Sequence, residues 1–397
     1  MRMPNVTPTR RSLWGVAGLF LTLWTPPPIR AQADAAPAHA PEPAAESVPA
    51  ADGAAARVAA DDSRAKAGWR WALLPAIFST PETGVGGGAG LLLTHRSGEQ
   101  SAATPPQALP VFGLYTEKGQ TSIAFAPELH LHGGDWTVEL EASYVDFPSR
   151  FYGVGRDAPR EAEESYTLEA TAAEPVVLRR ILSHLRVGLA AELQAFRIRE
   201  TEPFGLLESG AVLGHDRGRL AGIGPVLRWD SRENRFYPAR GSWLQLSARA
   251  YRDWLGGDYV YESYAADLRT YRSVAGRHII AFQILAIDRP GRVPFGQLAR
   301  LGRSLRGVFE ERYVDHAALM GQIEYRFPIW RRFSGVCFAG AGDVAPRPHA
   351  WRLDRMRPTA GAGLRFAINP AERMNVRFDF AVGDEETQIY FQFLEAF

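Results

Sequence analysis

The chain has 397 residues, and its 45 Lys and Arg against 44 Asp and Glu give a formal net charge of +1. This balance offers no electrostatic argument for nucleic-acid binding. The single cysteine, Cys337, excludes an intrachain disulfide, and it lies too far along the chain to carry a lipoprotein anchor. Beyond the N-terminus no charge-free apolar run reaches the ~20 residues that a transmembrane helix needs, so a helical membrane protein is excluded as well.

Residues 1–33 have the features of a cleaved secretory signal peptide. Arg10 and Arg11 form a basic region, residues 13–24 form an apolar core, and residues 31–33 form a small-residue cleavage site. The alternative is an N-terminal membrane anchor, which the short apolar core disfavours. Residues 34–68 form an Ala/Pro-rich tract with few large apolar side chains, so we expect a disordered periplasmic leader.

From residue 69 to residue 397 the pattern changes to alternation with a period of two. Near the C-terminus, for example, Phe378 and Phe380 alternate with Arg377 and Asp379. In a strand these two sets point to opposite faces. A soluble sandwich would bury the apolar set, whereas a membrane barrel turns it toward lipid and keeps the charged set in the lumen. The length and recurrence of the segments favour the barrel.

The fold class expected is therefore all-β, a transmembrane antiparallel β-barrel of 16 strands. An even number of strands is typical of bacterial single-chain barrels. With both termini in the periplasm, odd-to-even connections are extracellular, and they include the long ones at 147–163, 200–216, 289–315 and 345–354. The strands are expected at 70–79, 84–96, 108–117, 119–132, 135–146, 164–178, 185–199, 217–230, 241–253, 259–272, 277–288, 316–329, 333–344, 355–367, 372–383 and 387–397.

The last expected strand carries aromatic residues on one face, namely Phe391, Phe393 and Phe397. Outer-membrane barrels commonly end in this way, and such an ending is read as a signal by the barrel-assembly machinery. We therefore expect Phe378, Phe380, Phe391 and Phe393 to face lipid. The chain is expected in the outer membrane of a Gram-negative bacterium, with membrane lipid and the assembly machinery as partners.

Two motifs lie in the connections between expected strands or at the strand ends beside them. Leu305-Arg306-Gly307-Val308 falls in the longest loop. The stretch between the expected eighth and ninth strands has regularly placed polar, proline and glycine residues, namely Asp230, Arg232, Asn234, Pro238 and Gly241. Weaker pieces are residues 79–84, 151–155 and 390–397.

In this order the pieces resemble the BamA/TamA family of outer-membrane assembly factors (bacterial surface antigen barrels), across about residues 79–397. The resemblance implies that the loop carrying Leu305, Arg306 and Gly307 folds into the lumen, where Arg306 pairs with an acidic residue of the wall. Arginine suits this role because its planar fork makes bidentate bonds and stays charged when desolvated. The polar stretch would be a periplasmic turn motif.

The sequence departs from the family in two ways. The usual acidic residue of the thirteenth strand is missing, because the chain has Gly340 there. Glu324 is the first candidate to replace it and Asp343 is the second. In addition, we expect no POTRA domain before the barrel, because residues 34–68 are too short and too polar to form one.

Other chemistry finds little support. His130 and His132 share an expected lumenal face and could bind a metal, but no third ligand lies nearby, so rim histidines are the favoured interpretation. Cys337 alternates with alanines and is interpreted as a small lipid-facing residue. No Ser/His/acid set has motif spacing. We therefore expect no enzymatic activity, no metal and no cofactor.

The leading hypothesis for function is a role in outer-membrane biogenesis or in protein or lipid translocation, with client proteins or a periplasmic module as possible partners. The family's mechanism would be a weak seam between first and last strands, which Pro75 in the first strand favours because proline cannot donate to a ladder. The alternative is a passive pore or a surface structural barrel without assembly activity.

Overall fold

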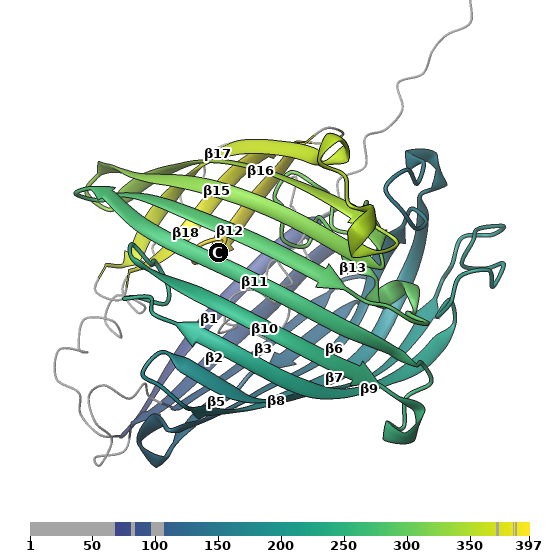
Figure 1. Ribbon diagram of the computed structural model, residues 1–397, viewed down its shortest axis with the longest axis horizontal. Coiled ribbons are helices and arrows are strands. Elements are labelled where there is room, and N and C mark those ends of the chain that lie inside the picture. The colour runs from purple at the N-terminus through teal and green to yellow at the C-terminus, as the bar shows by residue number, and fades with distance from the viewer. Residues whose placement is uncertain (1–67, 81–83, 97–106, 371–372, 384, 386) are drawn as a thin grey trace, which may run out of the picture.

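The computed structural model describes residues 68–80, 84–96, 107–370, 373–383, 385 and 387–397. The expected signal peptide and nearly all of the expected leader lie outside the described residues. The described part is all-β, with strands that run obliquely around a wall (Figure 1). Among the described residues, no helix is both long and apolar enough to cross a membrane.

Seventeen strands form the main sheet, and β13 and β14 form a separate pair. The strands are β1 (Gly68–Thr80), β2 (Gly84–Arg96), β3 (Gln107–Thr116), β4 (Thr121–Phe125), β5 (Glu128–Leu131), β6 (Trp136–Phe151), β7 (Glu164–Arg180), β8 (Leu185–Arg199), β9 (Arg217–Asp230), β10 (Gly241–Tyr251), β11 (Tyr261–Ala275), β12 (His278–Asp288), β13 (Ala299–Arg300), β14 (Val314–Asp315), β15 (Ala317–Trp330), β16 (Phe333–Ala345), β17 (Arg357–Asn369), β18 (Met374–Val382) and β19 (Thr387–Phe393). Single 3-10 turns are η2 (His132–Gly134), η3 (Arg160–Ala162), η4 (Asp253–Leu255), η5 (Phe295–Gln297), η6 (Pro348–Ala350) and η7 (Leu353–Arg355).

The main sheet has sixteen positions because β4 and β5 share one of them. Both pair with β6 on one side and with β3 on the other. The expected strand 119–132 is interrupted at Pro127, which has no N–H to give to a ladder, and the Pro127 carbonyl instead accepts from the Leu140 N–H at 3.1 Å. The expected count of sixteen is therefore confirmed.

Side chains divide between the two faces of the wall as the alternation predicts. On β18, Phe378 and Phe380 are 47% and 46% exposed, whereas Arg377 and Asp379 are 2% and 0% exposed. Apolar outside and charged inside is the arrangement of a membrane barrel rather than of a soluble sandwich. Cys337 is likewise exposed on the outer face. The side chains of Phe391 and Phe393 lie outside the described residues.

The end of the chain differs from the expected strand 387–397. The last strand stops at Phe393, and Leu394 adopts a left-handed conformation with φ 63°. Residues 394–397, which we call the C-terminal tail, turn into the lumen, where Phe397 is buried beside Tyr271 and Ala281. The prediction that Phe397 shares a face with the strand's other phenylalanines was therefore wrong. The tail turns inward because buried arginines of the wall bind it, as described below.

In the main sheet each of the sixteen positions pairs antiparallel with the next one along the chain. Among the described residues, however, no strand pairing joins β19 back to β1. The edges of these two strands therefore form a seam without a backbone ladder.

The two ends of the barrel differ in their connections. One end, the turn end, has short links such as 181–184 and 331–332. The other end, the loop end, has the long links 152–163, 200–216, 252–260 and 289–316. Residues of the links 200–216, 252–260 and 289–316 pack with strand residues in one apolar cluster at the loop end, which includes Phe151, Leu207, Tyr259, Phe295 and Val314.

Candidate functional site

Residues 289–316, between β12 and β15, turn inward and pack on the inner wall; we call them the lock loop. Its apolar residues Leu301, Leu305 and Val308 are each at most 4% exposed. They share one cluster with Leu285 and Met320 of the wall. This burial removes apolar loop surface from water and so holds the loop inside the barrel.

Arg306 extends from the lock loop to two carboxylates on different strands. Its Nη2 lies 2.7 Å from Glu324 Oε2 on β15, and its Nη1 donates to Asp379 Oδ2 on β18 at 2.9 Å. The guanidinium also lies 3.5 Å from the ring centroid of Phe338 on β16. The structure thus brings Arg306 and Glu324 together, and it adds Asp379, which the sequence analysis did not single out.

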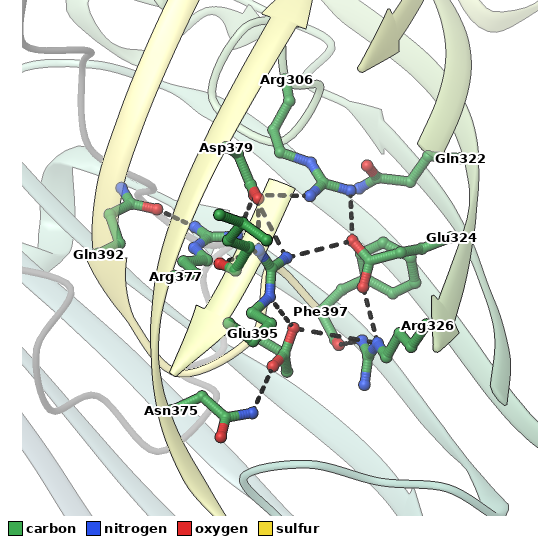
Figure 2. A network of polar contacts seen from close by, with 12 residues as sticks. Arg306, Gln322, Glu324, Arg326, Asn375, Arg377, Asp379, Gln392, Glu395 and Phe397 are labelled. Carbon is green, nitrogen blue, oxygen red and sulfur yellow. Dashed lines mark hydrogen bonds and ion pairs between the residues drawn. The ribbon is translucent and has the colours of Figure 1, made fainter. Parts of the chain in front are cut away.

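Further charged side chains surround the contact of Arg306 with Glu324 and Asp379, as Figure 2 shows. Glu324 Oε1 accepts from Arg326 Nε at 2.7 Å, and Arg365 bonds Asp379 through its Nη1. The Nε of Arg365 donates to Glu395 of the C-terminal tail at 2.8 Å. We call this set the lumenal ion network; its members are Arg306, Glu324, Arg326, Arg365, Asp379 and Glu395. Every member is buried, so each charge depends on its partners rather than on water.

Gly307 allows the lock loop to approach the last hairpin closely. Its φ is +92°, a conformation that other residues rarely adopt. Its N–H donates to the Tyr390 hydroxyl at 2.8 Å, and a Cβ at this position would lie 3.1 Å from the carbonyl of Val382. Arg306 therefore supplies the charge, and Gly307 allows the lock loop to lie close to the hairpin of β18 and β19.

Gly340 also has a structural explanation. A Cβ there would lie 2.7 Å from Leu305 Cδ1, and a Cβ at Gly342 would overlap Leu301 Cδ1. The two glycines of β16 thus leave room for the leucines of the lock loop. An acidic side chain at residue 340 would occupy the space that Leu305 fills, so the acidic partners of Arg306 lie on other strands.

Asp343, the second expected partner of Arg306, lies elsewhere. It pairs with Arg156 at 3.0 Å and accepts from the Arg352 N–H at 3.1 Å, toward the loop end. The prediction of Asp343 as a partner of Arg306 was therefore wrong. Asp343 and Glu324 lie at different heights along the barrel. The alternation of side chains along a strand does not determine this height.

The turn motif, residues 230–241, approaches the same network from the turn end. Asn234 Oδ1 accepts from the N–H groups of Phe236 and Tyr237 at 2.9 and 2.7 Å, which makes a tight turn. Pro238 is buried and its carbonyl accepts from Arg326 at 3.5 Å. The Arg326 guanidinium lies 5.2 Å from the Tyr237 ring.

Two further residues of the motif stabilise the turn itself. Asp230 pairs with Arg232 at 2.8 Å. Gly241 has φ +98°, and a Cβ there would overlap the Ser231 carbonyl, so only glycine fits without strain.

The lock loop is also fastened at the loop end, above the ion network. Arg312 donates to Glu385 at 2.7 and 3.0 Å, and the Tyr313 hydroxyl donates to the same carboxylate at 2.6 Å. Burial raises the pKa of Glu385, but the hydrogen bonds from Arg312 and Tyr313 and the positive charge of Arg312 outweigh it, so this pKa lies below its usual value. The link thus depends on an ionised Glu385.

The histidine pair does not form a metal site. His130 is buried and lies 3.1 Å from Glu128, whereas His132 begins the exposed turn η2 with φ 50°. The expectation that both share a lumenal face was wrong, because the strand ends at Leu131. Within the described residues no group of three His, Cys, Asp or Glu side chains could hold a metal ion.

No model of a protein family matches the sequence, and no curated protein matches it either. Solved structures do match. The chain is 15% identical to BamA from Haemophilus ducreyi lacking POTRA domains 1–3, with a TM-score of 0.57 over 83% of this chain and 70% of that one.

CdiB from Escherichia coli gives 14% identity and a TM-score of 0.55 over 81% of this chain and 62% of that one. CdiB from Acinetobacter baumannii gives 11% identity and a TM-score of 0.50 over 82% of this chain and 59% of that one. The chain thus spans about three fifths of the two CdiB chains. At these identities the likeness shows the fold, an outer-membrane β-barrel of the BamA and CdiB kind.

Proposed function

We propose that this chain is a non-enzymatic outer-membrane barrel of BamA/TamA type, which acts in outer-membrane biogenesis or in protein or lipid translocation. Its seam between β1 and β19 would part and accept an incoming strand. On this proposal the turn end faces the periplasm and the loop end faces outward. Client proteins or a periplasmic module would be its partners, and its own insertion would use the barrel-assembly machinery, with the last strand, Phe391 and Phe393 included, as the signal.

The observation that carries the proposal is the seam without a ladder. An unpaired strand edge presents N–H and C=O groups that pair readily with another strand. The edge of β1 is thirteen residues long and that of β19 is seven, so the two edges do not match in length. Trp69 and Trp71 on β1 are 64% and 65% exposed. Pro75 removes one donor from the β1 edge.

The lumenal contents favour this proposal over a passive pore. A water-filled pore keeps its lumen polar and open. Here the lock loop places buried leucines against β16, and the lumenal ion network is desolvated. A surface structural barrel is compatible with a plugged lumen, but a structural barrel gains nothing from an unpaired seam.

The decisive experiment closes the seam chemically. In a Cys337→Ser background, Leu73→Cys on β1 and Ile389→Cys on β19 are joined by a bismaleimide. The matched control joins Leu364→Cys to Phe378→Cys, which face each other across the paired strands β17 and β18. Each protein is placed in vesicles, and a second outer-membrane barrel, unfolded in urea, is added from outside as the client. The folding of this client is followed by its heat-modifiable gel shift.

We expect the parent and the control crosslink to accelerate client folding, and the seam crosslink to return it to the rate of empty vesicles. The seam-opening role would be refuted if the parent gives no acceleration. Steady ion conductance that the seam crosslink leaves unchanged would then identify a passive pore.

A further inference from the structure

The two ends of the barrel carry different charge patterns on their exposed surfaces. Within the described residues of the turn end, exposed arginines far outnumber exposed carboxylates, of which there are two, Asp135 and Glu233. Asp135 pairs with Arg180 and Glu233 with Arg373. The exposed arginines of this end are Arg179, Arg180, Arg235, Arg240, Arg272, Arg277, Arg331, Arg332 and Arg373.

The loop end carries both signs instead. Its exposed arginines lie beside exposed carboxylates, as in Arg219 with Asp258 at 3.2 Å and Arg352 with Asp354 at 2.9 Å. Further exposed acidic residues, such as Glu208, add negative charge at this end. The positive charge is therefore concentrated at one end of the barrel, although the whole chain carries a net charge of only +1.

Two of the turn-end arginines lie on the outer face of the wall. Arg179 follows the exposed Val177 by two residues on β7, and Arg272 follows the exposed Leu268 by four residues on the same face of β11. In a strand, residues two apart share a face. These guanidinium groups therefore border the apolar band that faces lipid.

Aromatic rings accompany the arginines at this border. The Arg179 guanidinium lies 5.6 Å from the Trp136 ring centroid, and that of Arg331 lies 4.7 Å from the Trp330 ring centroid. Tryptophan at the edge of an apolar band is the usual residue of the membrane–water interface. A guanidinium held on such a ring stands at the depth of lipid headgroups.

We propose that the arginine belt formed by Arg179, Arg272 and Arg331 binds the phosphate groups of anionic phospholipids in the leaflet at the turn end. A guanidinium makes bidentate, charge-assisted hydrogen bonds to phosphate. The apolar face beside it accepts the acyl chains of the same molecule. An acidic protein would satisfy the charge but would leave that apolar face without a partner, so lipid fits both features.

This inference rests on the membrane-spanning barrel of the proposed function but not on seam opening. The test uses the full chain in detergent, titrated with phosphatidylglycerol or with phosphatidylcholine, and bound lipids are counted by native mass spectrometry. The variant is Arg179→Gln, Arg272→Gln and Arg331→Gln together. The matched control makes the same charge change at the loop end with Arg197→Gln, Arg347→Gln and Arg355→Gln, three exposed arginines.

We expect the parent and the control to retain phosphatidylglycerol in preference to phosphatidylcholine, and the belt variant to lose about tenfold of that preference at low salt. Heat-modifiable mobility checks that each protein is folded. The proposal is overturned by equal retention of the two lipids by the parent, or by equal losses in variant and control. Binding of polyglutamate to the belt without any lipid preference would overturn it in favour of an acidic protein partner. None of these outcomes depends on client folding, so the lipid site can fail while seam opening stands.

Discussion

Replacing Arg306 by methionine tests whether the lock loop is held by charge. Removing one partner of a buried ion pair costs about 3–5 kcal/mol, because it leaves an uncompensated charge. Here Glu324 keeps Arg326 at 2.7 Å, and Asp379 keeps Arg365. The loss should therefore lie near the lower limit, about 3 kcal/mol. Methionine keeps most of the volume, so the cavity contribution stays small.

Glu324→Gln should cost more than Arg306→Met, about 5 kcal/mol. Glu324 is fully buried and lies between Arg306, Arg326 and Arg365, at 2.7, 2.7 and 3.7 Å. Its neutralisation leaves three guanidinium groups close together with one carboxylate fewer. The order of the two variants is thus a sharper test than either value alone.

The assay is equilibrium urea unfolding of the protein in lipid vesicles, with trypsin cleavage of the lock loop as a second readout. Arg352→Met is the control, because Arg352 and its partner Asp354 are 60% and 64% exposed; a change within about 0.5 kcal/mol is expected. A loss below about 1 kcal/mol for Arg306→Met would equal that of an exposed pair and would refute the buried lock. A larger loss for Arg306→Met than for Glu324→Gln would refute the charge argument.

Three other predictions use the same protein. Gly340→Asp should displace Leu305 and increase trypsin cleavage of the lock loop, although it supplies a carboxylate near Arg306; unchanged protection would contradict the packing argument. Phe380→Arg should cost about 2–4 kcal/mol in vesicle unfolding, because the side chain faces lipid, and a negligible cost would place it outside the bilayer. The folded pKa of Glu385 lies below its usual value of 4.5, so its link to Arg312 and Tyr313 contributes stability above the unfolded pKa, and this contribution is lost as pH falls through the folded pKa. Protease protection of the loop end should therefore fall as the pH is lowered below about 4.5 in the parent but not in Glu385→Gln.

The strands could be predicted because alternation is a local property of the chain. Each strand's two faces follow from the sequence alone. Lumenal parity, together with the family resemblance that implied a lumenal arginine, selected Glu324 as the first candidate partner of Arg306. The break at Pro127 could have been predicted from the missing donor. The inward tail could not, because its cause is a set of arginines on strands distant in sequence.

Asp379 was missed for a related reason. It is the one carboxylate of β18 and it has lumenal parity, so a signal existed. Its height relative to Arg306 depends on the stagger of the strands around the barrel, and no local pattern records that stagger. Asp343, the second candidate, was wrongly included for the same reason, since it lies nearer the loop end.

Three segments turn into the lumen and meet at the lumenal ion network, namely the lock loop, the turn motif and the C-terminal tail. Arg326 touches Glu324, the turn motif through Pro238, and the C-terminal tail through the Phe397 carbonyl at 3.0 Å. Arg365 joins Asp379 to Glu395 of the tail. The network therefore holds the lock loop and the end of the last strand at once.

This arrangement explains why β19 is shorter than β1. Once Glu395 and Phe397 are bound inside, β19 cannot continue past Phe393 along the longer edge of β1. Besides its ladder with β18, the last strand is held from within by its tail and by the bond from the Gly307 N–H to the Tyr390 hydroxyl. Loosening the lumenal ion network would remove contacts of the lock loop and of the C-terminal tail at the same time. One set of buried charges therefore secures both the lock loop and the tail that follows β19.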